Sequence, residues 1–247
     1  MRSWMPIVLA AAVCTAGCGG GLLKKQYEYE EELYLALDGS ATLNVNASVP
    51  ALVALRGVDL IVSPRTRFDR DRVRAFFRGP DANVTAISSS RREGRRFVHV
   101  SVDVSDVRAL QRLAPFAWSS YRFDREGDIY EFRQAVGAPV VKPVGDVGWN
   151  GTELVAFRLH LPSKIDFHNA PSHRVERGNI LEWEQALTER LRGTPVDIQV
   201  QMETQSILAR TLLLFGSTIV AAFLTLGAVI WWVSRRGRDS EMAESRT

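Results

Sequence analysis

The longest uninterrupted apolar stretch of the chain lies near its C-terminus, at residues 211–233. It contains no charged residue, and twelve of its residues are Leu, Ile, Phe or Val. A helix rises about 1.5 Å per residue, so this stretch is long enough to cross roughly 30 Å of hydrocarbon. Two tryptophans lie near its end, at the position where membrane helices place aromatic residues beside the lipid headgroups. Three arginines follow (Arg235, Arg236 and Arg238). We predict a transmembrane helix over 211–233 and, because Arg-rich ends stay inside, a cytoplasmic tail over 234–247.

A second apolar run, at the N-terminus, predicts a secretory signal. Residues 1–18 begin with Arg2, continue with an apolar run over 4–13 and end in the small residues that precede Cys18. Thr15 to Cys18 resembles the bacterial lipobox, in which the cysteine is acylated, and we predict lipidation of Cys18; signal cleavage without acylation is the alternative. Both cysteines lie in this segment. The extracytoplasmic part therefore has no pair to oxidise, and its fold must rest on core packing.

Alternation of apolar and polar residues predicts three β-hairpins in residues 19–134. The paired stretches are 26–37 with 41–49, 83–90 with 95–104, and 118–123 with 129–133. Apolar residues at three and four spacing predict short amphipathic helices over 69–77 and 105–113, with Ser105 as the cap of the second, and 50–55 is typical of a helical turn. The expected fold class is α+β, with antiparallel hairpins and short helices.

Glycine and proline are dense in residues 135–151, which predicts a linker there. Residues 152–206 form a second, β-rich segment with expected strands at 154–161, 180–184 and 196–202. The sequence leaves open whether 19–134 and 152–206 pack as one domain or as two.

Basic and acidic residues are equal in number in the part of the chain between the two terminal segments, but they are segregated along it. Residues 19–206 carry 25 Lys and Arg against 25 Asp and Glu, which gives no support for binding to nucleic acid. Residues 28–38 are acidic, whereas residues 65–96 carry ten arginines against four acids. The arginines predict a site for anionic headgroups, since guanidinium groups make forked hydrogen bonds to phosphate. A solvated helix face is the alternative. The predicted binding residues are Arg65, Arg67, Arg70, Arg74, Arg92 and Arg96.

Two groups of polar residues could in principle supply a chemical site, but their spacing favours structural roles. The first could supply zinc ligands (His160, Asp166, His168 and His173), but its spacing fits no closed ligand set. The second could supply an acid–base pair (His99, Asp103 and Asp106), but these positions fit an exposed strand and a helix start. No P-loop, dinucleotide fingerprint or nucleophile elbow is present. We predict no catalysis, no metal and no cofactor.

The predicted span offers a surface for a partner. Helical spacing places four small residues on one face, where they allow close packing with another membrane helix (Ser217, Ala221, Thr225 and Ala228).

One segment resembles a known family. Leu161 and Pro162, then Asn169, then Gly178 to Trp183 follow the Pro-x-x-hydrophobic, Asn, Gly-Asn-x-hydrophobic-x-Trp pattern of the LppM-type bacterial lipoproteins. The plan of signal peptide, lipobox, early strand ending in an Asp-Gly-Ser turn and one C-terminal span is also similar. The resemblance implies a non-enzymatic, membrane-tethered α+β domain of the cell envelope that handles lipid or glycolipid. A structural or assembly subunit of a membrane complex is the rival expectation.

Overall fold

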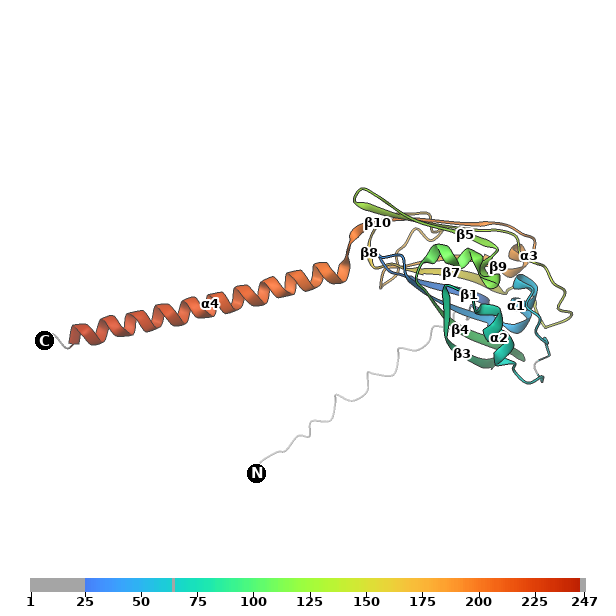
Figure 1. Ribbon diagram of the computed structural model, residues 1–247, viewed down its shortest axis with the longest axis horizontal. Coiled ribbons are helices and arrows are strands. Elements are labelled where there is room, and N and C mark those ends of the chain that lie inside the picture. The colour runs from blue at the N-terminus through green and yellow to red at the C-terminus, as the bar shows by residue number, and fades with distance from the viewer. Residues whose placement is uncertain (1–24, 64, 245–247) are drawn as a thin grey trace, which may run out of the picture.

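In the computed structural model, which describes residues 25–63 and 65–244, ten strands form two sheets (Figure 1). The larger sheet has the order β3-β4-β2-β1-β7-β9, and the smaller has the order β5-β6-β10-β8. Only β1 and β7 pair in parallel among these strands. The larger sheet comprises β1 (Tyr27–Leu35), β2 (Ala41–Ser48), β3 (Ala82–Arg92), β4 (Arg95–Val104), β7 (Leu154–His160) and β9 (Ile180–Ala186). The smaller comprises β5 (Ser119–Glu126), β6 (Ile129–Val136), β8 (Ser163–His168) and β10 (Val196–Ser206).

Helices are few and short apart from the last, which confirms the α+β class. They are α1 (Val49–Arg56), α2 (Arg70–Phe77), α3 (Leu187–Leu191), α4 (Ile207–Glu244) and the 3-10 helices η1 (Val107–Arg112) and η2 (Ala114–Phe116). Asp69 caps α2 by accepting a hydrogen bond from the backbone nitrogen of Arg72. The helix predicted over 105–113 is instead a 3-10 helix. Its cap is Asp106 rather than Ser105, because the Asp106 carboxylate accepts from the nitrogen of Arg108.

The three predicted hairpins are present as β1–β2, β3–β4 and β5–β6. The strand pairs that join distant parts of the chain were not predicted. β7 lies between β1 and β9, and β10 lies between β6 and β8. The ranges 19–134 and 152–206 therefore both contribute strands to both sheets.

The segment 137–153 has no regular secondary structure, and it packs on the rest of the protein. The nitrogen of Val140 donates to the Leu55 carbonyl, and Val144 and Trp149 contact the core. Among the described residues, this segment covers the ends of α1 and β4 rather than extending into solvent.

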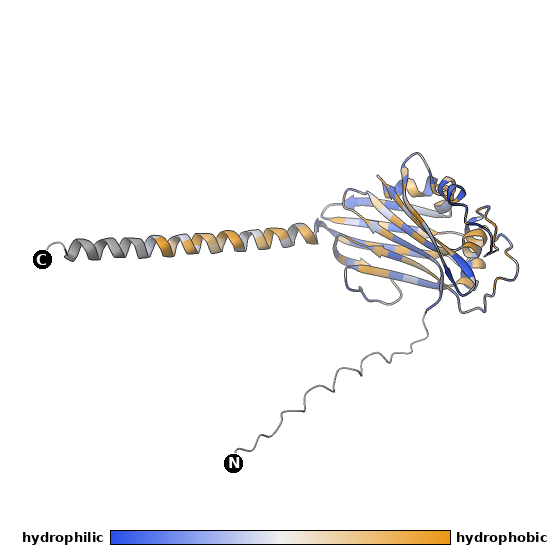
Figure 2. Cartoon of the chain, turned by 90° about the horizontal axis from the view of Figure 1, so that it is seen from below, coloured by the Kyte–Doolittle hydropathy of each residue, from blue (hydrophilic) through white to orange (hydrophobic). Residues whose placement is uncertain are grey.

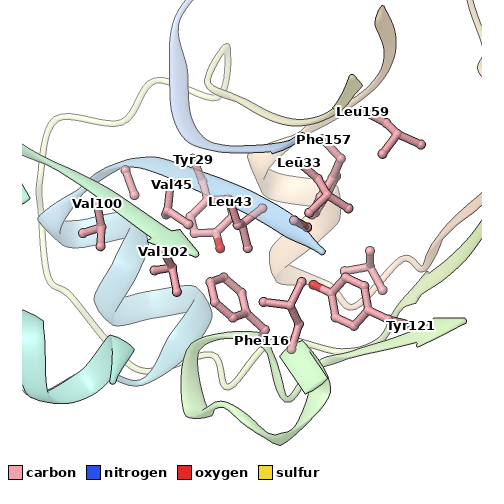
Figure 3. Packing of buried hydrophobic residues seen from close by; sticks show 14 of the residues in the cluster. Tyr29, Leu33, Leu43, Val45, Val100, Val102, Phe116, Tyr121, Phe157 and Leu159 are labelled. Atoms are coloured by element: carbon pink, nitrogen blue, oxygen red, sulfur yellow. The ribbon is translucent and has the colours of Figure 1, made fainter. Parts of the chain in front are cut away.

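The core lies between the two sheets and is closed by α1, α2 and the 3-10 helices. Its buried apolar members all come from residues 29–202. Figure 3 shows Tyr29 and Val45 of the larger sheet facing Phe116 and Tyr121. Figure 2 shows the alternation of polar and apolar positions along the strands that produces this packing. Because α4 contributes nothing to the core, the domain is expected to fold without it.

The residues that carry the family resemblance fasten the two sheets together. The Asn169 side-chain oxygen accepts hydrogen bonds from Trp183 Nε1 at 3.2 Å and from the Gln199 nitrogen at 2.9 Å. Asn179 adopts a left-handed conformation, with φ of 63°, and its amide donates to the carbonyls of Leu161 and Ser163. The pattern is thus explained by its structural role, since it joins β7 and β9 to β8 and β10.

Helix α4 continues directly from β10 and stands away from the domain (Figure 1). Its segment Thr211–Trp232 has a mean hydropathy of 2.3 over its most apolar window and is not buried against any described residue. By length and composition it can cross a membrane, as predicted. The helix runs on to Glu244, so most of the expected cytoplasmic tail is helical. Cys18 and the predicted signal lie outside the described residues.

Candidate functional site

Most of the predicted arginines lie at the end of the domain opposite to the one where α4 leaves, whereas Arg74 contacts β3 toward its other end. Ser48 ends β2, caps α1 and pairs with Phe97, so α1 and the β3–β4 turn lie at the same end of the larger sheet. Figure 1 shows α1, α2 and the segment between them on the side away from α4. We call this region, formed by residues 49–72, 91–97 and 139–149, the far end.

A hollow of about 200 Å³ at the far end brings several arginines together. Its apolar lining comes from Val49, Leu60, Ile61 and Phe68, and its cationic lining from Arg67, Arg72 and Arg96. We call it the arginine hollow. The Arg96 guanidinium donates to the Thr66 carbonyl at 3.0 Å, which ties β4 to the segment before α2. An apolar floor beside guanidinium groups suits a group that has both an anionic head and an apolar part.

Acidic residues neutralise part of this cationic rim. Arg72 pairs with Asp59 at 3.2 Å and with Asp69 at 3.7 Å, and both pairs are solvent-exposed. Exposed pairs of this kind contribute only about 0–1 kcal/mol, so an incoming anion can compete for the guanidinium.

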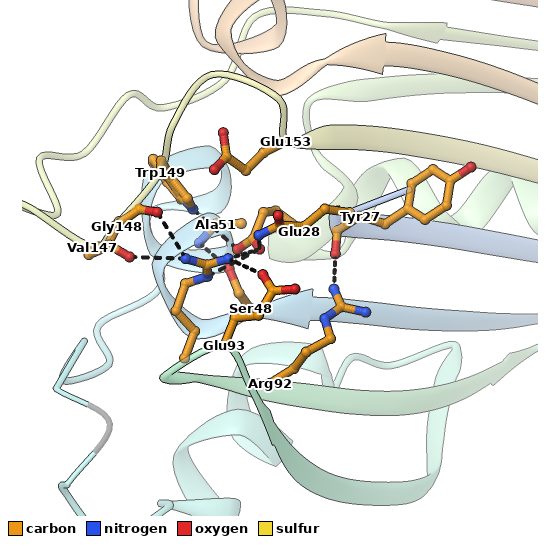
Figure 4. A network of polar contacts seen from close by, with 12 residues as sticks. Tyr27, Glu28, Ser48, Ala51, Arg92, Glu93, Val147, Gly148, Trp149 and Glu153 are labelled. Carbon is orange, nitrogen blue, oxygen red and sulfur yellow. Dashed lines mark hydrogen bonds and ion pairs between the residues drawn. The ribbon is translucent and has the colours of Figure 1, made fainter. Parts of the chain in front are cut away.

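A neighbouring hollow of about 470 Å³ has walls fixed by Arg95. Arg95 is nearly buried; it pairs with Glu28 at 3.0 Å and with Glu93 at 3.1 Å, and it donates to the carbonyls of Val147 and Gly148 (Figure 4). Trp149 Nε1 adds a hydrogen bond to the second oxygen of Glu28 at 3.2 Å. These contacts occupy the Arg95 guanidinium. It holds the 137–153 segment against β1 and β4 and shapes the hollow.

Of the six arginines predicted from the sequence, Arg67 and Arg96 meet in the arginine hollow. Arg92 donates to the Tyr27 carbonyl and lies over the Phe97 ring, with 4.2 Å between the guanidinium carbon and the ring centroid. Arg74 donates to the Val84 carbonyl at 3.1 Å. Arg65 and Arg70 are exposed near the same surface. Arg72 lines the hollow but was not among the predicted binding residues. Binding by these arginines stays a prediction.

The residues weighed as zinc ligands lie in separate surroundings. His160 stacks on Tyr34, with ring centroids 3.9 Å apart, and His168 Nδ1 accepts from the nitrogen of Ala170 at 3.3 Å. Over residues 25–63 and 65–244, no three His, Cys, Asp or Glu side chains gather as a metal site.

The residues weighed as an acid–base group are also separated. His99 contacts Asn46 through Nδ1 and Ser90 through Nε2, both at 2.8 Å. Partial burial, with a contribution from the charge of Arg92, lowers the pKa of His99. Asp103 instead accepts from Thr42, and Asp106 caps η1. The polar contacts of His99 are with neutral side chains of the neighbouring strands.

Comparisons with known proteins give similarity to solved structures. No family model matches the chain, and no curated protein matches it. The NMR structure of the folded domain of the Mycobacterium tuberculosis LppM protein matches with a TM-score of 0.39 and 14% sequence identity, covering 74% of this chain and 94% of that one. This matched structure belongs to the LppM protein, whose family the segment from Leu161 to Trp183 resembles.

Proposed function

We propose that this protein is a non-enzymatic, membrane-anchored binding protein that holds a lipid or glycolipid with an anionic headgroup outside the cytoplasm. The observation that supports this proposal is the arginine hollow, where Arg67, Arg72 and Arg96 border an apolar floor. Guanidinium forks suit phosphate oxygens, and the apolar lining suits the part of a lipid next to its head. α4 supplies the anchor.

The position of the hollow favours capture of a ligand over permanent contact with the anchoring bilayer. α4 leaves from the opposite end of the domain (Figure 1). With the strands upright on α4, the arginine hollow faces away from the membrane that α4 enters. The domain is then placed to hold a lipid away from that bilayer or to meet a second envelope layer.

Vesicle flotation tests whether the exposed arginines bind anionic lipid. The protein is the fragment 24–206, which retains every member of the core. We expect it to float with anionic vesicles and not with neutral ones, and to detach as salt rises, because exposed charges are screened within about 8 Å at physiological ionic strength. Arg65→Gln, Arg67→Gln, Arg70→Gln and Arg72→Gln combined should remove most of this flotation, since each arginine near an anionic surface contributes up to about 1 kcal/mol.

A matched control removes the same charge from other exposed arginines. It combines Arg122→Gln, Arg125→Gln, Arg174→Gln and Arg177→Gln, all exposed and distant in sequence from the arginine hollow. The control should float like the parent. Loss of flotation in the control but not in the test variant would place membrane contact elsewhere, and salt-insensitive flotation of both would show that the arginines only solvate the surface. Binding to a membrane protein through α4, without lipid binding, would favour the assembly-subunit alternative.

A further inference from the structure

A buried arginine without a charged partner lies in α3. Arg190 has 0% of its surface exposed. One of its terminal nitrogens donates to the Gly137 carbonyl at 2.5 Å, whereas Nε and Nη1 are buried without a hydrogen-bond partner. Within the described residues, no carboxylate lies at ion-pair distance from it. A guanidinium in this state has lost its water and gained only one hydrogen bond in return.

A second buried arginine increases the positive charge at the same place. Arg56 donates to the Tyr29 hydroxyl through Nε and Nη2, at 3.1 and 3.0 Å, and to the Glu31 carboxylate at 2.9 Å. Its Nη1 is buried without a partner. Both guanidinium groups lie over the ring of Trp118, that of Arg190 at 5.1 Å from the ring centroid. Burial and the charge of Arg56 lower the pKa of Arg190.

The charges at this centre do not balance. Glu31 supplies the carboxylate of this centre, and this carboxylate forms an ion pair with Arg56. The neighbouring Tyr29 and Tyr121 hydroxyls stay neutral, because burial raises the pKa of each far above its usual value. Two guanidinium groups therefore share one carboxylate, which leaves one positive charge. Buried charges are normally paired, so a missing anion is the simplest way to balance this centre.

A surface hollow shares two residues with this centre. It has a volume of about 620 Å³ and is lined by Trp118, Ser119 and Gly137, together with residues of β6 and β10, among them Asp197. Gly137 supplies the carbonyl that Arg190 contacts, and Trp118 supplies the ring over which both arginines lie. We infer that a phosphate-type oxyanion enters through this hollow and pairs with the unpaired nitrogens of Arg190, with Arg56 behind it. Nε and Nη1 of Arg190 and Nη1 of Arg56 are the buried donors without a partner, and the oxygens of a phosphate group can accept hydrogen bonds from them.

This site is separate from the arginine hollow and does not depend on the proposed lipid binding. The test uses the full-length protein in neutral phosphatidylcholine nanodiscs, so that the anchor and the domain are both intact. Equilibrium dialysis measures binding of inorganic phosphate, of dihexanoyl phosphatidic acid and of dihexanoyl phosphatidylcholine. We expect saturable binding of one phosphate per protein and a rise in the unfolding midpoint of about 5 to 10 °C at 100 times the dissociation constant.

Arg190→Met should weaken phosphate binding at least tenfold and abolish the rise in the unfolding midpoint. It removes an unpaired buried charge, so the variant should fold at least as well as the parent. Arg190→Lys keeps the charge but removes the unpaired Nε and Nη1 donors, so it should also weaken binding. If the Met variant does not fold, the Lys variant tests the proposal in its place. Arg177→Gln, at an exposed position outside both hollows, is the control and should bind phosphate like the parent.

The three probes separate the sources of the anion. Similar affinity for inorganic phosphate and phosphatidic acid would identify a site for a free anion, and at least tenfold tighter binding of phosphatidic acid would identify a lipid headgroup. Equal binding of phosphatidylcholine and phosphatidic acid would overturn the inference, as would the absence of saturable phosphate binding or full binding by both Arg190 variants. Loss of phosphate binding with intact flotation would leave the proposed function standing.

Discussion

At the scale of single residues, the acidic segment of the sequence proves to be a set of charges paired with distant arginines. Glu28 pairs with Arg95, and Glu31 pairs with Arg56. On the opposite face of β1, Arg158 contacts the three carboxylates of Glu30, Glu32 and Glu182. The negative charge of the acidic segment is therefore largely neutralised in space. The sequence could not reveal this, because every partner lies on a different strand or helix.

Histidines on the larger sheet make the stability of the domain depend on pH. Burial is the main cause that lowers the pKa of His99, and the charge of Arg92 lowers it further. Burial also lowers the pKa of His160. Above about pH 6.5, these side chains are neutral in both states. As pH falls below that value, the unfolded chain takes up protons before the folded one does. Folding stability is then lost until pH passes the folded-state pKa, below which the loss stops.

We therefore expect the urea midpoint of the 24–206 fragment to fall between pH 7.5 and 5. His99→Gln removes one of the titrating groups and should make this decrease smaller. Urea titrations at both pH values, followed by far-UV circular dichroism, measure the effect. A variant with the same decrease as the parent would exclude His99 as a source of the pH dependence.

At the scale of secondary structure, local signals were sufficient for hairpins and insufficient for distant pairing. β1–β2, β3–β4 and β5–β6 combine period-two alternation with a short turn, so each can be predicted from one stretch of chain. β8 was missed because it follows Pro162 and has few buried residues, and its partner β10 lies more than thirty residues away. The parallel pairing of β1 with β7 has no local signal either.

The candidate sites show the same difference between residues that a local pattern identifies and residues whose role depends on distant packing. Arg67 and Arg96 were found because both belong to a stretch unusually rich in arginine. Arg190 lies in Leu187–Leu191, where a Glu precedes it, and this pattern is typical of an exposed helix. Its burial depends on packing against Trp118 and Gly137, which no local pattern reports.

Asn169 provides a test of how the two sheets are fastened. Asn169→Ala removes the acceptor for Trp183 Nε1 and for the Gln199 nitrogen, and the donor to the Asp197 carbonyl. A buried donor left unpaired costs about 1–3 kcal/mol, so we expect a loss of at least about 2 kcal/mol in the free energy of unfolding. Asn83→Ala, at an exposed position of β3, should change it by less than about 0.5 kcal/mol. Urea denaturation of both variants measures the difference, and equal stability would refute the fastening role.

At the scale of the whole molecule, the two expected membrane attachments begin at opposite ends of the domain. Tyr29 pairs with Ala47, so β1 starts at the far end, whereas α4 leaves from the other end. The chain from Cys18 to Lys25 spans at most about 25 Å when fully extended, and the nine residues of β1 span about 30 Å. Acylation of Cys18 would therefore draw the far end toward the bilayer and incline the strands along it. Without acylation, α4 alone leaves the domain free to stand upright.

Orientation across the membrane is the remaining whole-molecule prediction, and it depends on the arginines that follow the span. Arg235, Arg236 and Arg238 favour a cytoplasmic C-terminus, with the domain outside. Single cysteines test this in intact cells with a membrane-impermeant maleimide. Ser172→Cys, in an exposed loop of the domain, should be labelled without permeabilisation, and Ser240→Cys should be labelled only after it. The parent chain measures labelling of its own cysteines. Labelling of Ser240→Cys but not of Ser172→Cys in intact cells would reverse the topology, and the arginine hollow would then face the cytoplasm, where the proposed extracytoplasmic ligand could not reach it.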